Sequence, residues 1–381
     1  MKRIIAYSTA IILLLASSCN KPLGTTVPEQ FDRYIFFSQG VDTKAGLIEN
    51  TGDLDGKEFA VLGYKYDITS SWDTYKTTTP APTPNVFVTD PNELYETVEC
   101  DASGDGSYAP LQGWSNSKKY TFFAYYPKDL AVKNYDPNTF AISNYTGGSP
   151  YIFYVMDYSQ TDVKSKMVDI MTGGCHHLNS NGNKEHTSPC QKDLFWKSSS
   201  TGENNVANGE VKFRFEHRLS SLGVKAKLSQ TGGTVKITGI KFKIEGIKNT
   251  SIIIPLEGGA SRPTGPLNPI SADVTLDIPD GKSVTATDYS EVSDKLIFIP
   301  QDSQLSIRII VDYERSAPGY VSYSTSITIP AEDQDPLSIS SLVEGIKYMI
   351  PLNFTESSVT VSGNINGEKW ANSHEITDTF N

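Results

Sequence analysis

Short runs in which apolar and polar residues alternate constrain the fold of this chain more than any other feature. In the run VKFRFEHRLSSLGVKAKL, the apolar residues Val211, Phe213 and Phe215 alternate with charged residues. A period of two places successive side chains on opposite faces of a strand, with one face towards a core. Runs rich in β-branched and aromatic residues recur along the chain, and no long stretch follows a helical period. The sequence therefore predicts an all-β fold.

The spacing of the predicted strands is typical of a β-sandwich. In the first half they lie at residues 34–38, 59–66, 85–88, 119–127, 151–158 and 166–171. In the second half they lie at residues 211–228, 234–247, 251–256, 295–300, 305–314, 320–330, 342–354 and 359–365. Half-buried strands joined by regular turns favour antiparallel sheets packed face to face.

The length of the chain, 381 residues, suits two domains better than one core. Between residues 173 and 208 the composition shifts to Ser, Asn, Gly, Lys and Thr, which is typical of a loop followed by a linker. We therefore expect two tandem antiparallel β-sandwich domains at residues 34–197 and 211–381, with a linker at residues 198–210.

The first twenty residues have the pattern of a secretion signal. Two basic residues precede an apolar run from Ile4 to Ala16, which is shorter than the roughly twenty residues that span a bilayer. Small residues then lead directly to Cys19, as in bacterial lipoprotein signals. We expect a signal peptide at residues 1–18, acylation of Cys19 and a polar tether at residues 19–33. The alternative is an ordinary cleaved signal with a cysteine there by chance.

The composition and motifs exclude several classes of protein. A net charge of −11 offers no basic surface for nucleic acid, and 38 % hydrophobic residues argue against wholesale disorder. Hydrolase, metalloprotease, phosphate-loop and dinucleotide-binding signatures are missing from the sequence. His217 precedes Ser220 and Ser221, but it ends a predicted strand, so we expect it to pack or to form a hydrogen bond. We predict that the protein is not an enzyme and needs no cofactor.

Two polar stretches raise the question of a metal. The stretch from Asp101 to Gly106 resembles the start of a calcium loop, but Gln112 stands where the bidentate glutamate belongs, so a turn is expected.

The second polar stretch, GGCHHLNSNGNKEHTSPC, leaves three readings open. Outside the cytosol, Cys175 and Cys190 can form a disulfide that closes a loop, and we favour this reading narrowly over unpaired thiols. The third reading is a zinc site with Cys175, Cys190, His186 and one of His176 or His177, for which the ligand types fit and the spacing is poor.

Several stretches carry a likeness to a known family. They are IFFSQGVDTKAG, FAVLGY, GWSNSKKYTFFAYYP, VDIMTG, VKFRFEHRLSSLGVKAKL, LVEGIKYMIPLNF and VTVSGNINGEKW. In this order, and behind a lipoprotein signal, they resemble the fimbrillin-like family, the lipoprotein pilins and pilin relatives of Gram-negative anaerobes. The resemblance implies two transthyretin-like sandwich domains and a lipid-anchored fimbrial subunit of the outer membrane surface that takes part in adhesion.

The resemblance also implies assembly by strand exchange with other fimbrial subunits. A protease would cut after a basic residue near the first strand, and a strand of the next subunit would take the place of that strand. Here the departing strand is residues 34–38, and the candidate cuts follow Arg33 or Lys44. We favour Lys44, since a cut there separates the strand from the main body. The incoming strand would be residues 359–365. The alternative is that both basic residues are ordinary polar residues and the protein stays anchored.

A second function stays open at this point. The chain could be a monomeric surface lipoprotein that binds a glycan or a host protein through exposed Trp72, Trp196 or Trp370. Each tryptophan is nevertheless expected to be buried in a core.

Overall fold

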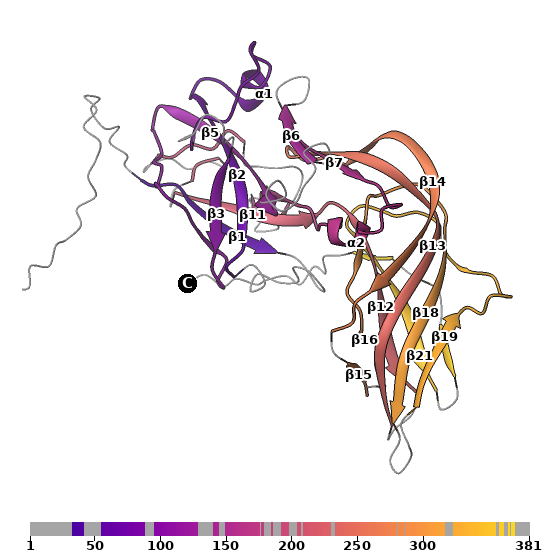
Figure 1. The fold of residues 1–381 in the computed structure, drawn as a ribbon. Helices are drawn as coiled ribbons and strands as arrows, with labels where there is room; N and C mark the ends of the chain where they lie inside the picture. Colours follow the sequence, from indigo (N-terminus) through magenta and orange to yellow (C-terminus); the bar gives the residue numbers. More distant parts are fainter. Residues whose placement is uncertain are drawn as a thin grey trace, which may run out of the picture.

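A computed structural model gives the fold. It describes residues 33–41, 55–87, 95–128, 140–144, 149–175, 177–178, 184–185, 192–197, 204–206, 209–229, 233–279, 281–285, 287–316, 323–355, 358–361, 365 and 367–369. These residues form two lobes, a barrel that is mostly purple in Figure 1 and a larger lobe that is mostly orange. The all-β prediction is confirmed.

The first lobe is a closed barrel with the described strands in the order β1-β11-β8-β5-β2-β3-β4. Their bounds are β1 Phe36–Val41, β2 Glu58–Asp67, β3 Glu96–Cys100, β4 Asp105–Ser107, β5 Lys118–Tyr126, β8 Met171–Cys175 and β11 Glu210–His217. A separate two-stranded sheet pairs β9, His177–Leu178, with β10, Lys184–Glu185. The sequence predicted a two-layer sandwich for this part. Alternation cannot separate the two architectures, because a barrel and a sandwich both bury one face of each strand.

The second lobe contains two sheets. The six-stranded sheet consists of β12 Ser220–Leu228, β16 Ser290–Glu291, β17 Leu296–Phe298, β21 Ile346–Phe354, β22 Val359–Val361 and β23 Gly367–Lys369. The eight-stranded sheet consists of β6 Phe140–Asn144, β7 Pro150–Met156, β13 Thr234–Pro255, β14 Arg262–Leu276, β15 Lys282–Val284, β18 Leu305–Ser316, β19 Tyr323–Ile329 and β20 Leu337–Ile339. Apolar side chains of both sheets belong to one buried cluster.

Among the described strands, most pairs are antiparallel, as predicted. Two pairs are parallel, β1 with β11 and β12 with β21. Neither parallel pair is joined by a hairpin, since more than a hundred residues separate its members along the chain. The sequence pattern carries no sign of such distant pairings.

Strands β2 and β5 are buried on both faces and join the two lobes. Phe59 and Val61 point into the barrel cluster, whereas Leu62 and Tyr64 belong to the cluster that continues into the second lobe. On β5, Phe122 and Phe123 divide in the same way. Burial on both faces explains why these segments are nearly continuous apolar runs rather than alternating ones. The two lobes therefore share apolar packing.

Strand pairing crosses the predicted domain boundary in both directions. Strand β11, which the sequence placed at the start of the second domain, closes the barrel against β1 and β8. Strands β6 and β7, which were expected in the first domain, extend the sheet of β13. The sequence could not show these pairings, because the order of strands along a chain does not decide which sheet each one joins. The linker at residues 198–210 stays a prediction.

Two predicted strands have other conformations. Residues 85–87 form no ladder, and the backbone N–H groups of Asn85 and Val86 both donate to the carbonyl of Gly63, at 2.8 and 3.1 Å. Residues 163–166 form the short helix α2, Val163–Lys166, and the strand that follows starts only at Met171. Short apolar runs do not distinguish a strand from a buried loop or a helical turn.

Helices are rare among the described residues. The other one is α1, Trp72–Tyr75, whose N-cap Ser71 accepts a hydrogen bond from the backbone N–H of Thr74 at 3.3 Å. Neither described helix has the length and apolar character that crossing a membrane requires.

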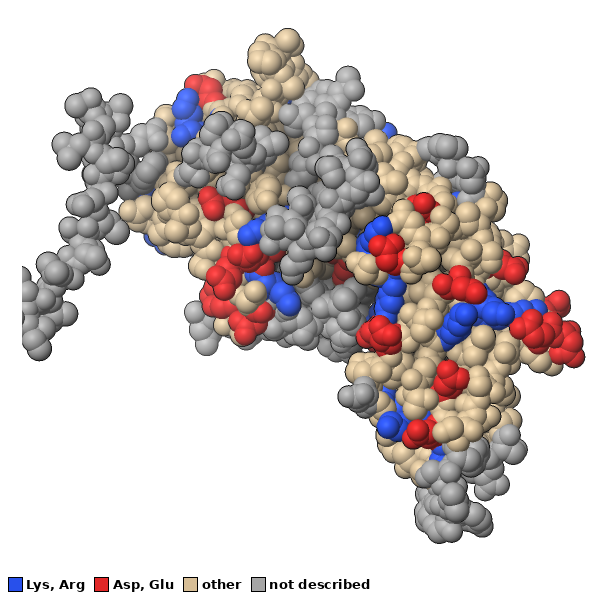
Figure 2. All heavy atoms as spheres, in the orientation of Figure 1, with Lys and Arg blue, Asp and Glu red and all other residues tan. Residues whose placement is uncertain are grey.

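Charged side chains of both signs are spread over the face drawn in Figure 2. The ion pairs of the described residues include Lys164 with Asp277, at 3.2 Å, and Lys241 with Asp273, at 3.6 Å. Exposed pairs of this kind contribute little to stability. The fold therefore rests mainly on its apolar clusters.

Candidate functional site

The first strand of the barrel and the slot that it fills form the candidate site. Strand β1 lies between β11, to which it is parallel, and the short strand β4, to which it is antiparallel. Phe37 is the partner of Val211 on one side and of Gly106 on the other. Strand β1 therefore closes the barrel by joining two strands that do not pair with each other.

Two side chains hold the first strand in the barrel core. Ile35 and Phe37 are 0 % and 2 % exposed. The ring of Phe37 packs against four other rings, with centroid distances of 5.4 to 5.8 Å. These rings belong to Tyr108, Phe213, Phe122 and Phe87. Aromatic pairs at such distances stabilise a core beyond the area that they bury. The slot is therefore shaped for a large aromatic side chain at this position.

Polar contacts fix the strand at its start. The hydroxyl of Tyr108 donates to the carbonyl of Ile35 at 2.9 Å, and the N–H of Ile35 donates to the carbonyl of Gln112 at 2.8 Å. Burial raises the pKa of Tyr108 to about 12, so its hydroxyl keeps its proton at neutral pH. The indole N–H of Trp114 donates to Gly209 at 3.0 Å.

Two glycines allow the backbones to approach closely at the slot. A Cβ on Gly106 would lie 2.6 Å from Val98 and 3.2 Å from the carbonyl oxygen of Phe37. Gly209 has a φ of +80°, and a Cβ there would lie 2.7 Å from the carbonyl oxygen of Tyr34. Larger residues at either position would push the first strand outwards.

Comparison with known proteins decides the family. A model of the fimbrillin-like family matches residues 70–370. The chain belongs to the fimbrillin-like family. The predicted resemblance is thereby confirmed.

Comparison with solved structures finds fimbrial proteins as well. A fimbrial protein from Bacteroides vulgatus has a TM-score of 0.53 at 19 % sequence identity, and the match covers 89 % of this chain and 100 % of that one. The fimbrial anchor protein Mfa2 from Porphyromonas gingivalis has a TM-score of 0.34 at 11 % identity, and the match covers 89 % of this chain and 98 % of that one. None of the curated proteins matches the chain in sequence.

The predicted site residues of this fimbrillin-like chain are described only in part. Arg33 is exposed at the start of the first strand, and its carbonyl accepts a hydrogen bond from the N–H of Trp114 at 2.9 Å. Cys19 and Lys44 lie outside the described residues. Acylation of Cys19 and cleavage at Arg33 or Lys44 therefore stay predictions.

The polar stretch with the two cysteines is likewise only partly described. The backbone of Cys175 ends β8 opposite Phe213, whereas His176, His186 and Cys190 lie outside the described residues. The disulfide and the zinc site both stay predictions. In the described part of the chain, no three His, Cys, Asp or Glu side chains gather as a metal site.

Two other predictions about polar residues are confirmed. Nδ1 of His217 lies 2.8 Å from Oδ1 of Asp169, both side chains are buried, and the hydroxyl of Ser220 donates to Val343 rather than to the histidine. Asp101 accepts hydrogen bonds from the N–H groups of Ser103 and Asp105, at 2.8 and 2.9 Å, and so forms a turn.

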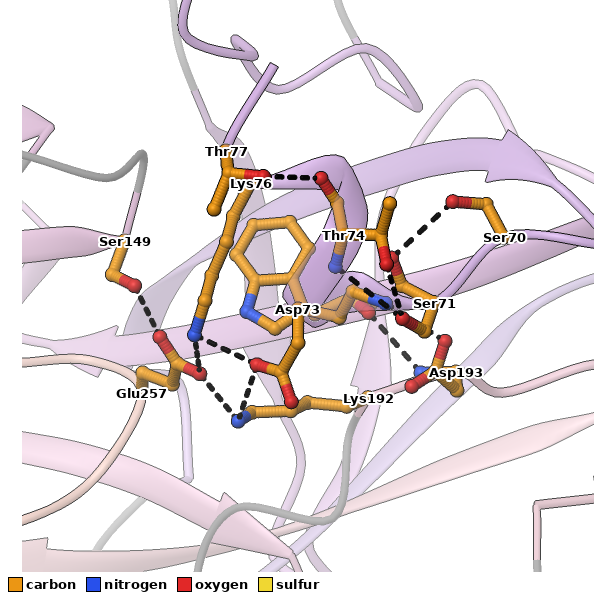
Figure 3. Close-up of polar contacts among 12 residues, drawn as sticks. Ser70, Ser71, Asp73, Thr74, Lys76, Thr77, Ser149, Lys192, Asp193 and Glu257 are labelled. Atoms are coloured by element: carbon orange, nitrogen blue, oxygen red, sulfur yellow. Dashed lines mark hydrogen bonds and ion pairs between the residues drawn. The ribbon is translucent and has the colours of Figure 1, made fainter.

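The structure also contains a cluster of charges that the sequence analysis missed. Figure 3 shows Glu257, in the turn after β13, together with Lys76 and Asp73 from the segment around α1. Nζ of Lys76 lies 2.9 Å from Glu257 and 2.7 Å from Asp73, and Glu257 also bonds to Lys192 and Ser149. No sequence signal could have found the cluster, because its members come from four distant segments.

The cluster is partly buried, which strengthens its interactions. Burial raises the pKa of Glu257, but the hydrogen bonds from Lys192, Ser149 and Lys76 outweigh burial, and the pKa lies below the ordinary value. The cluster therefore ties the barrel to the second lobe while Glu257 is ionised.

The tryptophans proposed as a binding platform lie inside the protein. Trp72 and Trp196 are buried, and Trp370 lies outside the described residues. The predicted burial of Trp72 and Trp196 is confirmed, so neither offers an exposed ring to a glycan.

Proposed function

We propose that the protein is a lipid-anchored fimbrial subunit of the outer membrane surface that takes part in adhesion and polymerises by exchange of its first strand. Membership of the fimbrillin-like family supports the fimbrial role. The observation that carries the strand-exchange part is the position of β1, which closes the barrel between β4 and β11.

Loss of β1 would leave a slot suited to another strand. The main-chain groups of β4 and β11 that now pair with β1 would lose their partners, and the cavity of Phe37 would be empty. Such an open edge binds an extended segment through main-chain hydrogen bonds, while alternate side chains fill its pockets. An incoming strand must therefore bring two apolar side chains at the spacing of Ile35 and Phe37.

The proposed donor segment matches this spacing, although its side chains are smaller than Phe37. Val359 and Val361 are two residues apart, and they belong to β22, the last strand in the order β16-β12-β21-β22. Val359 is buried in the second-lobe core. The segment would have to leave β21 before it could enter the slot of a neighbouring subunit, so donation costs the contacts of one short edge strand.

The backbone contacts of Arg33 favour cleavage at Lys44. The carbonyl of Arg33 belongs to the bond that a protease would cut, and it is engaged with Trp114. Tyr34, on the other side of that bond, pairs with Gly113. A protease must displace these contacts to reach the bond, because it binds its substrate as an extended segment. A cut after Lys44 would separate the lipid anchor and β1 from the main body together.

Intact mass and N-terminal sequencing of the protein from its own outer membrane test the proposal. A chain that begins at Ala45 and occurs in high-mass oligomers is the expected result. Lys44→Ala should abolish these oligomers, whereas Arg33→Ala, the matched control, should leave them unchanged. A chain that begins at acylated Cys19 and runs as a monomer would exclude strand exchange and retain only the anchored lipoprotein. An unacylated Cys19 in the Lys44→Ala variant, which keeps this residue, would exclude the anchor.

A further inference from the structure

An exposed apolar patch surrounds the start of the first strand. Tyr34, Phe36 and Leu111 are 49 %, 42 % and 44 % exposed, and they are three of the four large apolar side chains that are exposed in the described part of the chain. We call these three residues the aromatic patch. The fourth, Val343, lies on the second lobe before β21. The concentration at one place distinguishes the patch from scattered surface residues, which need no explanation.

The backbone pairing brings the three residues together. Tyr34 and Phe36 alternate with the buried Ile35 and Phe37, so both project from the outer face of the barrel. The N–H of Ile35 donates to the carbonyl of Gln112, the residue directly after Leu111. Tyr34 also pairs with Gly113. Leu111 therefore lies beside the two aromatic residues on the outside of the barrel.

The place of the patch in the chain identifies its partner. Cys19 lies fourteen positions before Arg33, which directly precedes Tyr34. A segment of that length reaches at most about 50 Å even when fully extended. The proposed anchor therefore enters the folded protein at the patch.

The chemistry of the patch fits a lipid surface. Tyrosine and phenylalanine side chains favour the boundary between headgroups and acyl chains, where the ring is shielded from water. The charged neighbours on β11 balance each other, since Nζ of Lys212 lies 3.6 Å from Glu210. The net charge of −11 gives no attraction to anionic lipids. Contact should therefore depend on apolar burial and change little with salt.

We infer that the aromatic patch is a membrane-contact surface, which lays the barrel on the bilayer beside its own lipid anchor. This inference rests on the proposed acylation of Cys19. It adds a consequence to the proposed cleavage, because Tyr34 and Phe36 belong to the segment that a cut at Lys44 would remove. One cut would then abolish both the anchor and most of the surface contact.

Flotation with vesicles of phosphatidylcholine and phosphatidylethanolamine tests the inference. The chain from Asn20 onwards serves as the protein without acyl groups, since every core residue of the described chain lies at or beyond Ile35. The variant Tyr34→Ser/Phe36→Ser/Leu111→Ser should bind vesicles at least about tenfold more weakly than the parent. Val343→Ser, an equally exposed apolar residue on the other lobe, is the matched control and should bind like the parent.

Leu111→Ser alone provides a second variant, which lies outside the strand ladder. We expect it to bind vesicles about threefold more weakly than the parent. Thermal unfolding verifies that each variant folds. A parent chain that does not float, or a triple variant that floats like the parent, overturns the inference. So does a parent that forms dimers which the triple variant loses, because the patch would then serve a second copy. These outcomes do not contradict the proposed function, because acylation and cleavage are determined in a different experiment, by intact mass.

Discussion

Phe37→Ala probes the slot of the first strand directly. The side chain is 2 % exposed and its ring contacts the rings of Tyr108, Phe213, Phe122 and Phe87. Truncation removes these contacts and leaves a cavity, which costs about 3–5 kcal/mol in well-packed cores. For a lobe of this size, each kcal/mol lowers the melting temperature by about 2–4 °C, so a decrease of roughly 10 °C is expected for the barrel.

Phe36→Ala is the matched control for this experiment. It removes the same side chain from the neighbouring position of the same strand, where 42 % of the residue is exposed. We expect it to cost no more than about 1 kcal/mol. Scanning calorimetry gives the melting temperatures, because the two lobes share apolar packing and a single two-state fit is not assured.

Hydrogen exchange locates the effect within the barrel. With Phe37→Ala, the amides of β4 and β11 should lose protection, because β1 is the strand that joins them. The amides of β12 and β21 should keep theirs. Equal costs for the two phenylalanine variants, or loss of protection spread evenly over both lobes, would refute the assignment of Phe37 as the residue that holds the first strand in its slot.

Two further predictions concern stability. Gly209→Ala should lower the free energy of unfolding in urea by about 1–3 kcal/mol. Gly56→Ala should cost less, because both glycines have a positive φ but only a Cβ at Gly209 would meet a carbonyl oxygen. Equal costs would argue against the close approach at Gly209. Glu257→Gln should cost about 1–3 kcal/mol at pH 7. The folded-state pKa of Glu257 lies below the ordinary value of 4.5. The stability that ionised Glu257 contributes is therefore complete above pH 4.5, and it is lost as the pH falls through the folded-state pKa. A difference in stability that does not decrease as the pH falls below 4.5 would contradict this account.

The strands were predictable because period-two alternation is a local property of the sequence. Val211, Phe213 and Phe215 alternate in the sequence, and all three are buried in the barrel. Their pairing was not predictable. The partner of Val211 is Phe37, and no local signal connects residues so far apart along the chain. Pattern analysis therefore recovered the strands and the fold class but not the closure of the barrel.

The candidate site was predictable to a similar degree. The first strand and the alternation of its inward side chains follow from residues 34–38, and the family resemblance gave that strand its proposed role. The pocket of Phe37 was not foreseeable, because its four rings come from separate loops and strands. The charges around Glu257 were missed for the same reason. Contacts that depend on tertiary proximity leave no local pattern.

Burial explains why β1, rather than β2 or β5, suits exchange. Strands β2 and β5 contribute to both apolar clusters, so removal of either would disrupt the barrel and the packing between the lobes. The buried residues at β1, Ile35 and Phe37, belong only to the barrel cluster. Their loss would open the slot while the cluster shared with the second lobe keeps its contacts. A subunit without β1 would therefore retain a folded second lobe and the proposed donor segment, and its barrel would have an open slot for a new strand.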